Sequence, residues 1–207
     1  MSDRVVRILK RPGCLLLSLL SGESLLVPGR LFRAHPLKVG DGIDLAAYRA
    51  LLLPLMGRAA LDQAARMLER RDHSQKEVAD KLLSQGYPEE VVSGAVDRLC
   101  AAGFLDDQKY AAGLISRLGK KAGVRRLKAE LARKGIPDVM AATLLEAIDP
   151  EEQLNHAVAL AHKALRGKSG SPPQRRQRAY AALTRRGFPP DLVTQALERA
   201  LAEAENE

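Results

Sequence analysis

The sequence predicts a mainly α-helical protein: an elongated tandem array of three three-helix repeats, preceded by a small N-terminal module with short β-strands. Three observations lead to this fold class. From Arg58 onward, apolar residues recur at helical spacing, and alanine and leucine dominate. Within that region, a glycine–apolar–proline pattern returns three times at nearly constant spacing. Before Arg58, short β-prone runs alternate with glycine and proline.

The N-terminal module is expected to cover residues 1–57. The expected strands cover residues 5–9, 15–20 and 24–27, and the turns between them fall at Pro12-Gly13 and Ser21-Gly22-Glu23. An alternative interpretation is a signal peptide, since basic residues precede the apolar run Cys14–Leu20. That run is short for a signal peptide and no A-x-A cleavage site follows it, so the strands are favoured.

Helix boundaries are indicated by capping residues. Ser74 and Glu77 have the spacing of a capping box, in which each side chain binds the backbone N–H of the other. Gly86 is expected to end that helix and Pro88 to occupy the first position of the next. The expected helices cover residues 58–71, 75–85 and 88–101, then 107–118, 123–134 and 137–147, then 150–166, 173–186 and 189–204.

A repeated pattern divides the helical region into three units. Gly86, Gly135 and Gly187 are each followed by an apolar residue and a proline, and they are separated by 49 and 52 residues. Apolar residues recur four residues before each glycine and five and ten residues after it: Leu82, Leu131 and Leu183; Val91, Met140 and Leu192; Val96, Leu145 and Leu197. The pattern predicts repeats over residues 58–105, 106–149 and 150–207, with an exposed loop inserted at Gly167–Pro173.

Small repeats of this kind are expected to stack, because about 50 residues bury little apolar surface alone. In the connector after the first repeat, Phe104 and Leu105 are expected to pack between repeats, and Asp106 or Asp107 to cap the next helix. Such an array presents one long face, which suits contact with a filament or a groove better than enclosure of a small substrate.

Composition limits the classes of function. The 207 residues carry 33 Lys and Arg against 25 Asp and Glu, a formal net charge of +8, which favours a polyanionic partner or one that already carries a polyanion. Aromatic residues make up 3%, which argues against a base-stacking platform for single-stranded nucleic acid. With two cysteines and no apolar run of membrane-spanning length, we expect a soluble, cytoplasmic monomer without membrane contact.

Residues 74–82 read SQKEVADKL and precede Gly86-Tyr87-Pro88, and residues 103–111 read GFLDDQKYA. These strings resemble the bacterial RecX family of recombination regulators, and the resemblance covers residues 58–204. It implies a negative regulator of homologous recombination and DNA repair that binds the RecA recombinase filament on single- or double-stranded DNA. It further implies inhibition of RecA's ATP hydrolysis, strand exchange and co-protease activity, by occupancy of the filament groove or capping of a growing end.

Basic residues gather on the expected middle helices of the second and third repeats. Formal charge is +4 for residues 1–57, −1 for 58–105, +3 for 106–150 and +2 for 151–207. We predict that two clusters contact DNA phosphates or an acidic surface of RecA, although any single member taken alone suits a solvated helix exterior. The clusters are Lys120, Lys121, Arg125, Arg126, Lys128, Arg133 and Lys134, and then Arg175, Arg176, Arg178, Arg185 and Arg186.

An enzyme is not expected. His156 and His162 lie on different faces of a helix, Cys14 and Cys100 lack a C-x-x-C partner, and no phosphate-binding loop motif occurs. No catalytic residue, cofactor or metal is therefore predicted. The alternative function is a non-specific DNA-binding helical protein that acts without recombinase, because three-helix units with a tight turn are similar to helix-turn-helix proteins.

Overall fold

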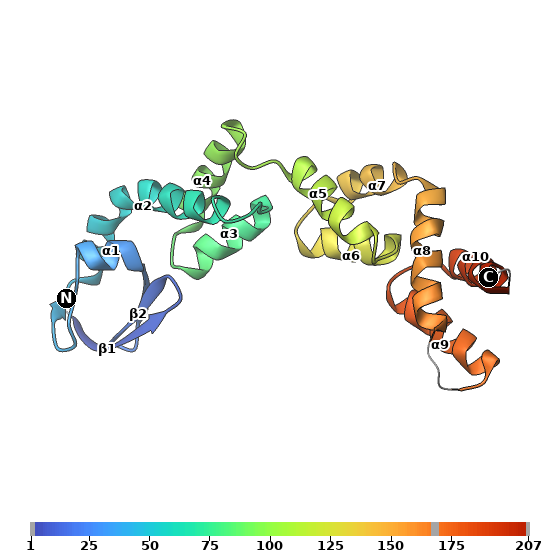
Figure 1. Ribbon diagram of the computed structural model, residues 1–207. Coiled ribbons are helices and arrows are strands. Elements are labelled where there is room, and N and C mark those ends of the chain that lie inside the picture. The colour runs from blue at the N-terminus through green and yellow to red at the C-terminus, as the bar shows by residue number, and fades with distance from the viewer. Residues whose placement is uncertain (1–2, 167–169, 206–207) are drawn as a thin grey trace. The chain divides into compact units, whose positions relative to one another are not determined.

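The computed structural model describes residues 3–166 and 170–205, and the chain divides into two units, Met1–Asp106 and Asp107–Glu207 (Figure 1). The first unit holds a β-sheet followed by helices, and the second unit is helical throughout its described residues. The predicted fold class, mainly helical with three-helix repeats after a small strand-containing module, is confirmed. The elongation of the array stays a prediction. No helix in the described ranges is long and apolar enough to cross a membrane.

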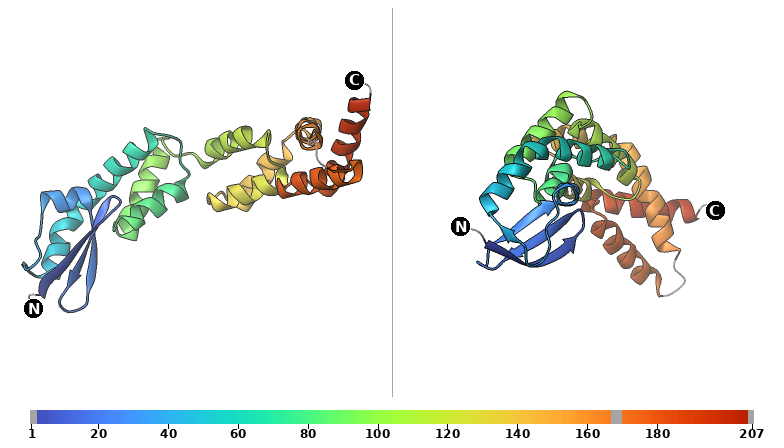
Figure 2. Two further views of the ribbon diagram at one scale, coloured as in Figure 1. Left: turned by 60° about the horizontal axis from the view of Figure 1, so that its bottom comes forward. Right: turned by 90° about the vertical axis from the view of Figure 1, so that its left-hand side faces the viewer.

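The N-terminal module contains an antiparallel sheet with the strand order β3-β2-β1-β4, whose strands lie side by side in Figure 2. The strands are β1 (Asp3–Arg11), β2 (Cys14–Leu19), β3 (Ser24–Pro28) and β4 (Gly42–Ile43). The three strands expected from the sequence are present, and the turns between them place Gly13 and Gly22 at positive φ. Strand β4 and the helix α1 (Gly29–Ala34) are additions to the prediction.

Helix α2 (Leu45–Leu68) begins earlier than the sequence predicts. The expected start at residue 58 is wrong, because the helix already covers the preceding 13 residues and so crosses the predicted end of the N-terminal module. The Asp44 side chain caps its start by accepting a hydrogen bond from the Ala47 N–H at 3.0 Å. The sheet module and the first three-helix bundle are therefore joined by one continuous helix.

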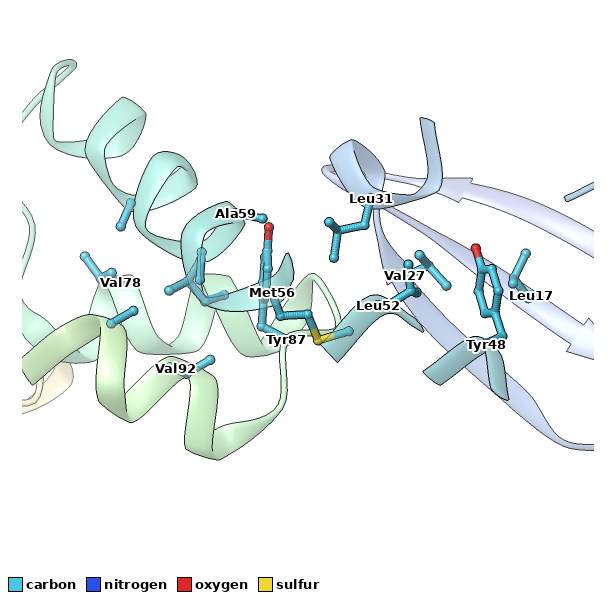
Figure 3. Packing of buried hydrophobic residues seen from close by; sticks show 14 of the residues in the cluster. Leu17, Val27, Leu31, Tyr48, Leu52, Met56, Ala59, Val78, Tyr87 and Val92 are labelled. Atoms are coloured by element: carbon cyan, nitrogen blue, oxygen red, sulfur yellow. The ribbon is translucent and has the colours of Figure 1, made fainter. Parts of the chain in front are cut away.

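Burial explains why α2 continues through Pro54. A proline inside a helix costs about 3 kcal/mol, since it removes one hydrogen bond and clashes with the preceding turn. Tyr48, Leu52 and Met56 stand on one side of this helix at four-residue spacing and are all buried. Figure 3 shows them in line between the sheet residues and the rest of the first bundle. Each large apolar side chain contributes about 1.5–3 kcal/mol on burial, which together exceeds the cost of the proline.

Helices α3 (Gln75–Ser84) and α4 (Glu89–Ala101) complete the first bundle, and each packs against the other and against α2. The predicted capping box is confirmed: the Glu77 N–H donates to Ser74 Oγ at 3.2 Å, and the Ser74 N–H donates to Glu77 Oε2 at 3.3 Å. Pro88 occupies the N-cap of α4 rather than the predicted first helical position. Its extended backbone, with ψ of 151°, lies outside the helical range.

The repeated glycine pattern has one physical basis, the Schellman turn. The Gly86 N–H donates to the Leu83 carbonyl at 3.0 Å, and the Tyr87 N–H donates to the Leu82 carbonyl at 3.3 Å, with Gly86 at φ +87°. This turn needs a residue without Cβ at the glycine and favours apolar contact between the residue after it and the residue four before it. The same bonds recur at Gly135 with Ala132, at Ile136 with Leu131, at Gly187 with Thr184 and at Phe188 with Leu183.

The second unit contains two further three-helix bundles (Figure 1). The helices are α5 (Asp107–Gly119), α6 (Val124–Arg133) and α7 (Asp138–Glu146), then α8 (Pro150–Leu165), α9 (Pro172–Arg185) and α10 (Pro190–Glu205). Each bundle has a core of its own. Leu127 and Leu131 are central to the core of α5–α7, and Leu183 and Phe188 are central to the core of α8–α10. The helix ends lie within two residues of those predicted.

Two local predictions concern the connector after the first repeat and the loop inserted in the third. Packing of Phe104 and Leu105 between repeats stays a prediction; Phe104 is 68% exposed, and Leu105 is buried in the core of the first unit. Of the inserted loop predicted at Gly167–Pro173, residues 167–169 lie outside the described residues, and Pro172 already begins α9. The division of the chain at the predicted repeat boundaries stays a prediction.

Candidate polyanion-binding surface

Helix α6 presents basic side chains because its sequence gives it two distinct faces. Leu127 and Leu131, four residues apart, are buried, while Arg125, Arg126 and Lys128 are exposed. Helix α9 is built in the same way, with Ala179 and Leu183 buried and arginines on the remaining surface. The packing of each bundle therefore turns the predicted basic residues towards solvent.

The start of α6 and the end of α9 are in direct contact. The Gly123 N–H donates to the Arg186 carbonyl at 2.9 Å, and the Arg125 N–H donates to the Gly187 carbonyl at 3.2 Å. A Cβ atom on Gly123 would lie 2.5 Å from the Gly187 oxygen, so glycine is required here by the closeness of the two backbones. Because of this contact, the arginines at the start of α6 stand beside those at the end of α9.

We call this meeting point the basic junction. It consists of Lys120, Lys121, Arg125, Arg126, Arg185 and Arg186. The structure thus brings one end of each predicted cluster together. It leaves Arg133 and Lys134 at the opposite end of α6, and Arg175 and Arg176 near the opposite end of α9.

The charges in the first turn of α6 are unfavourable for the stability of that helix. The positive end of a helix dipole favours acidic side chains in the first turn, and α7, α8 and α10 all carry them. Helix α6 has none there and instead carries Arg125 and Arg126 in its first turn. These two charges oppose the helix dipole, so a bound anion would relieve repulsion that the fold itself leaves in place.

The candidate residues differ in their surroundings. Arg133 donates from Nε to Glu130 at 3.0 Å, and Arg176 lies 3.9 Å from Glu198, so a carboxylate accompanies each of these two guanidinium groups. Arg175 is half-buried, and its Nε is enclosed without a hydrogen-bond partner. Eight candidates form no ion pair with any residue that the structure describes: Lys120, Lys121, Arg125, Arg126, Lys128, Arg175, Arg185 and Arg186.

A groove beside the basic junction adds a residue that the sequence does not single out. Between α8 and α9, a groove of about 400 Å³ is lined by Arg178, Arg185 and Arg186 and, from α8, by Lys163. Its floor is made of leucine and alanine side chains. Lys163 belongs to a different helix from the predicted cluster and carries no sequence signal, because only the packing of α8 against α9 brings it there.

No group of three or more His, Cys, Asp or Glu side chains that could hold a metal ion occurs in the part of the chain that the structure describes. His162 instead lies 2.8 Å from Glu203 through its Nε2, which links α8 to α10. Cys14 is buried, and Cys100 is half-buried against the core of the first unit.

Comparison with known proteins identifies the family. Residues 60–99 match the family description "RecX, first three-helix domain", and residues 151–197 match "RecX, third three-helix domain". Regulatory protein RecX of Prosthecochloris aestuarii is 33% identical over 146 residues, which cover 70% of this chain and 95% of that protein. This chain belongs to the RecX family. Regulatory protein RecX of Chlorobium limicola is also 33% identical, over 66% of this chain and 86% of that protein.

The fold of the RecX family extends over the N-terminal module as well. A crystal structure of regulatory protein RecX superposes with a TM-score of 0.65 at 22% identity and covers 95% of this chain and 99% of the other. The residues matched to the third three-helix domain of RecX include the whole of α9 and therefore the arginines that α9 supplies to the basic junction.

Proposed function

We propose that this protein is a negative regulator of homologous recombination and DNA repair that binds the RecA filament on DNA. Membership of the RecX family of regulatory proteins supports the regulatory role and RecA as the partner. In this proposal the protein inhibits RecA's ATP hydrolysis, strand exchange and co-protease activity, either by occupying the filament groove or by capping a growing end. It acts in the cytoplasm, stoichiometrically and as a monomer, without a catalytic site or a cofactor.

The basic junction is the observation that carries the binding mechanism. It gathers side chains from two bundles of the second unit at one place, where they can contact DNA phosphates or an acidic surface of RecA. Several weak contacts of this kind become strong together, because each one holds the others at high effective concentration once the first has formed. The remaining basic candidates on α6 and α9 extend the same surface.

The test is binding of a junction variant to RecA filaments assembled on single-stranded DNA. The variant Arg125→Glu/Arg185→Glu changes one exposed residue on each side of the basic junction, and neither forms an ion pair within the described residues. Arg49→Glu/Arg98→Glu makes the same change in net charge at exposed positions of the first unit and serves as the control. We expect about tenfold weaker filament binding for the junction variant alone.

Circular dichroism verifies that both variants are folded. Equal binding by the folded junction variant and the control would contradict the assignment of the basic junction. Substitution of Arg175 is avoided, because its half-buried side chain confounds binding with stability.

A further inference from the structure

A second basic groove lies in the first unit, where three elements distant in the sequence meet. The end of β1 contributes Lys10 and Arg11, α1 contributes Arg30 and Arg33, and α2 contributes Arg66. The groove measures about 450 Å³. All five side chains are exposed, and among the described residues no carboxylate lines this groove.

The charge of this groove is only slightly offset by its surroundings. Asp62 forms an ion pair with Arg30, and Arg66 donates a hydrogen bond to Gln63 at 2.8 Å, which leaves the guanidinium charge of Arg66 in place. Like charges gathered in a concave surface with apolar walls repel one another and concentrate positive potential. This repulsion opposes folding, whereas an anion in the groove would be strongly attracted.

The groove is preformed by close backbone contacts. Gly13 lies against Gln85, so that a Cβ on this glycine would stand 2.3 Å from the Gln85 side-chain nitrogen. The Gly29 N–H donates to the Gly13 carbonyl at 2.9 Å, which holds α1 against the β1–β2 turn. On the other side, a Cβ on Gly86 would lie 2.6 Å from the Leu26 oxygen. The sheet is thus fixed to the first three-helix bundle, and the basic side chains need no backbone rearrangement to face one ligand.

Tyr87 marks the floor of the groove. Its side chain is only 4% exposed, and Figure 3 shows the ring beside Met56 and Ala59 of α2, on the side facing Leu31. Burial raises the pKa of Tyr87, while the nearby charges of Arg66 and Arg30 act in the opposite direction. The phenol therefore lies close to the arginines, but its ring is buried and exposes no face on which a nucleobase could stack.

The groove continues into a second hollow that shares Gln63 and Arg66 with it. This hollow, of about 790 Å³, lies between α2 and α3 and adds Arg70, Arg71 and Lys81. Glu77 and Asp80 also line it, and each has a basic partner, in Arg71 and in Lys76 respectively. Basic side chains of the two hollows thus follow one another along a track. This track is longer than contact with a single phosphate group requires.

From these observations we propose that the track from the end of β1 along α2 binds the phosphate backbone of DNA without the help of a recombinase. A guanidinium group can donate two parallel hydrogen bonds to phosphate oxygens. Four of the five basic side chains in the first groove are arginines. An acidic protein partner would need an exposed apolar anchor, and no exposed large apolar side chain lines either hollow within the described residues. The site goes beyond the proposed function, because it involves neither the basic junction nor RecA.

Binding of bare DNA tests this inference. The variant Arg11→Glu/Arg33→Glu changes two exposed groove residues that form no ion pair with described residues, and Arg49→Glu/Arg98→Glu again supplies the control with equal net charge. The probes are a fluorescent oligodeoxythymidylate and a duplex of equal length, in the absence of RecA. We expect about tenfold weaker binding of the groove variant to at least one probe. We also expect its dependence of log affinity on log salt to be shallower by roughly 1.5.

Three outcomes would overturn the inference. Equal affinity of the wild-type chain and the folded groove variant for both probes would leave the track as a solvated surface. Equal loss in the groove variant and the control would assign binding to net charge alone. Unchanged DNA binding with lost binding to RecA filaments would assign the track to an acidic face of the recombinase. The junction variant reports on the proposed function separately, so the two failures are distinguishable.

Discussion

Gly187 lies where the turn between α9 and α10 touches the first turn of α6, and its replacement by alanine should destabilise the second unit. Two costs act together at this position. The backbone has a φ of +85°, which is strained for any residue with a Cβ atom. The new methyl group would also stand 2.4 Å from the Arg126 backbone nitrogen, which cannot move without shifting α6.

The magnitude follows from separating these costs. Positive φ costs a residue with a side chain about 1–2 kcal/mol, and forcing a methyl group into packed backbone costs about 1–3 kcal/mol. We therefore expect Gly187→Ala to lower the free energy of unfolding by about 2–5 kcal/mol. Gly103→Ala carries the φ cost alone, since φ is +73° and no atom lies within 4 Å of the new Cβ. Gly123→Ala carries the packing cost alone, since φ is −79°.

Urea unfolding followed by circular dichroism compares the wild-type chain with the four variants, which include Gly119→Ala as a control. Gly119 has open space around its Cβ position and lies at the end of α5, so alanine there should be neutral or slightly stabilising. If Gly187→Ala cost no more than Gly103→Ala, the contact between the α9–α10 turn and α6 would be refuted. The basic junction would then be refuted as well, because that contact is what brings its residues together.

Two further stability predictions concern side chains. Ser74→Ala removes the cap that accepts the Glu77 N–H and should lower the free energy of unfolding by about 1 kcal/mol, measured by urea unfolding; no change would contradict the capping box. The hydrogen bond from His162 lowers the pKa of Glu203 below its usual value of 4.5, so this carboxylate stabilises the fold above that pH and the contribution is lost as pH falls through the lowered pKa. The melting temperature of Glu203→Gln should therefore fall less on acidification than that of the wild-type chain; parallel curves would refute the link.

Most of the helical architecture could be predicted because its signals are local. The Schellman turn at Gly86 needs only a leucine four residues before, a glycine and an apolar residue after it, all within one short segment. The capping box at Ser74 is equally local. Such signals need no knowledge of tertiary structure, which explains why the predicted ends of the later helices lie so close to the observed ones.

The early start of α2 could not be predicted in this way. Pro54 and Gly57 are typical of a loop, and only burial of Tyr48, Leu52 and Met56 against the sheet and the first bundle makes the helix stable through that segment. Tertiary packing thus overrides a local signal.

The candidate site shows the same division between local and tertiary information. The basic clusters of α6 and α9 are evident from the sequence, but their meeting depends on the close approach of Gly123 and Gly187. The groove of the first unit has no local signal, because its charges come from the end of β1, α1 and α2. Four of its five basic residues belong to residues 1–57, with a net charge of +4, and Arg66 belongs to residues 58–105, with a net charge of −1, so the charge of neither segment shows that they share one groove.

The most direct test of the regulatory account is ATP hydrolysis by RecA on single-stranded DNA, titrated with this protein at fixed, moderate salt and with the order of addition varied. The account predicts inhibition: at well below one molecule per RecA if the protein caps growing ends, and near equal amounts if it occupies the filament groove. Unaffected hydrolysis, at protein concentrations that bind free DNA tightly, would contradict the account and leave a DNA-binding protein that acts without recombinase.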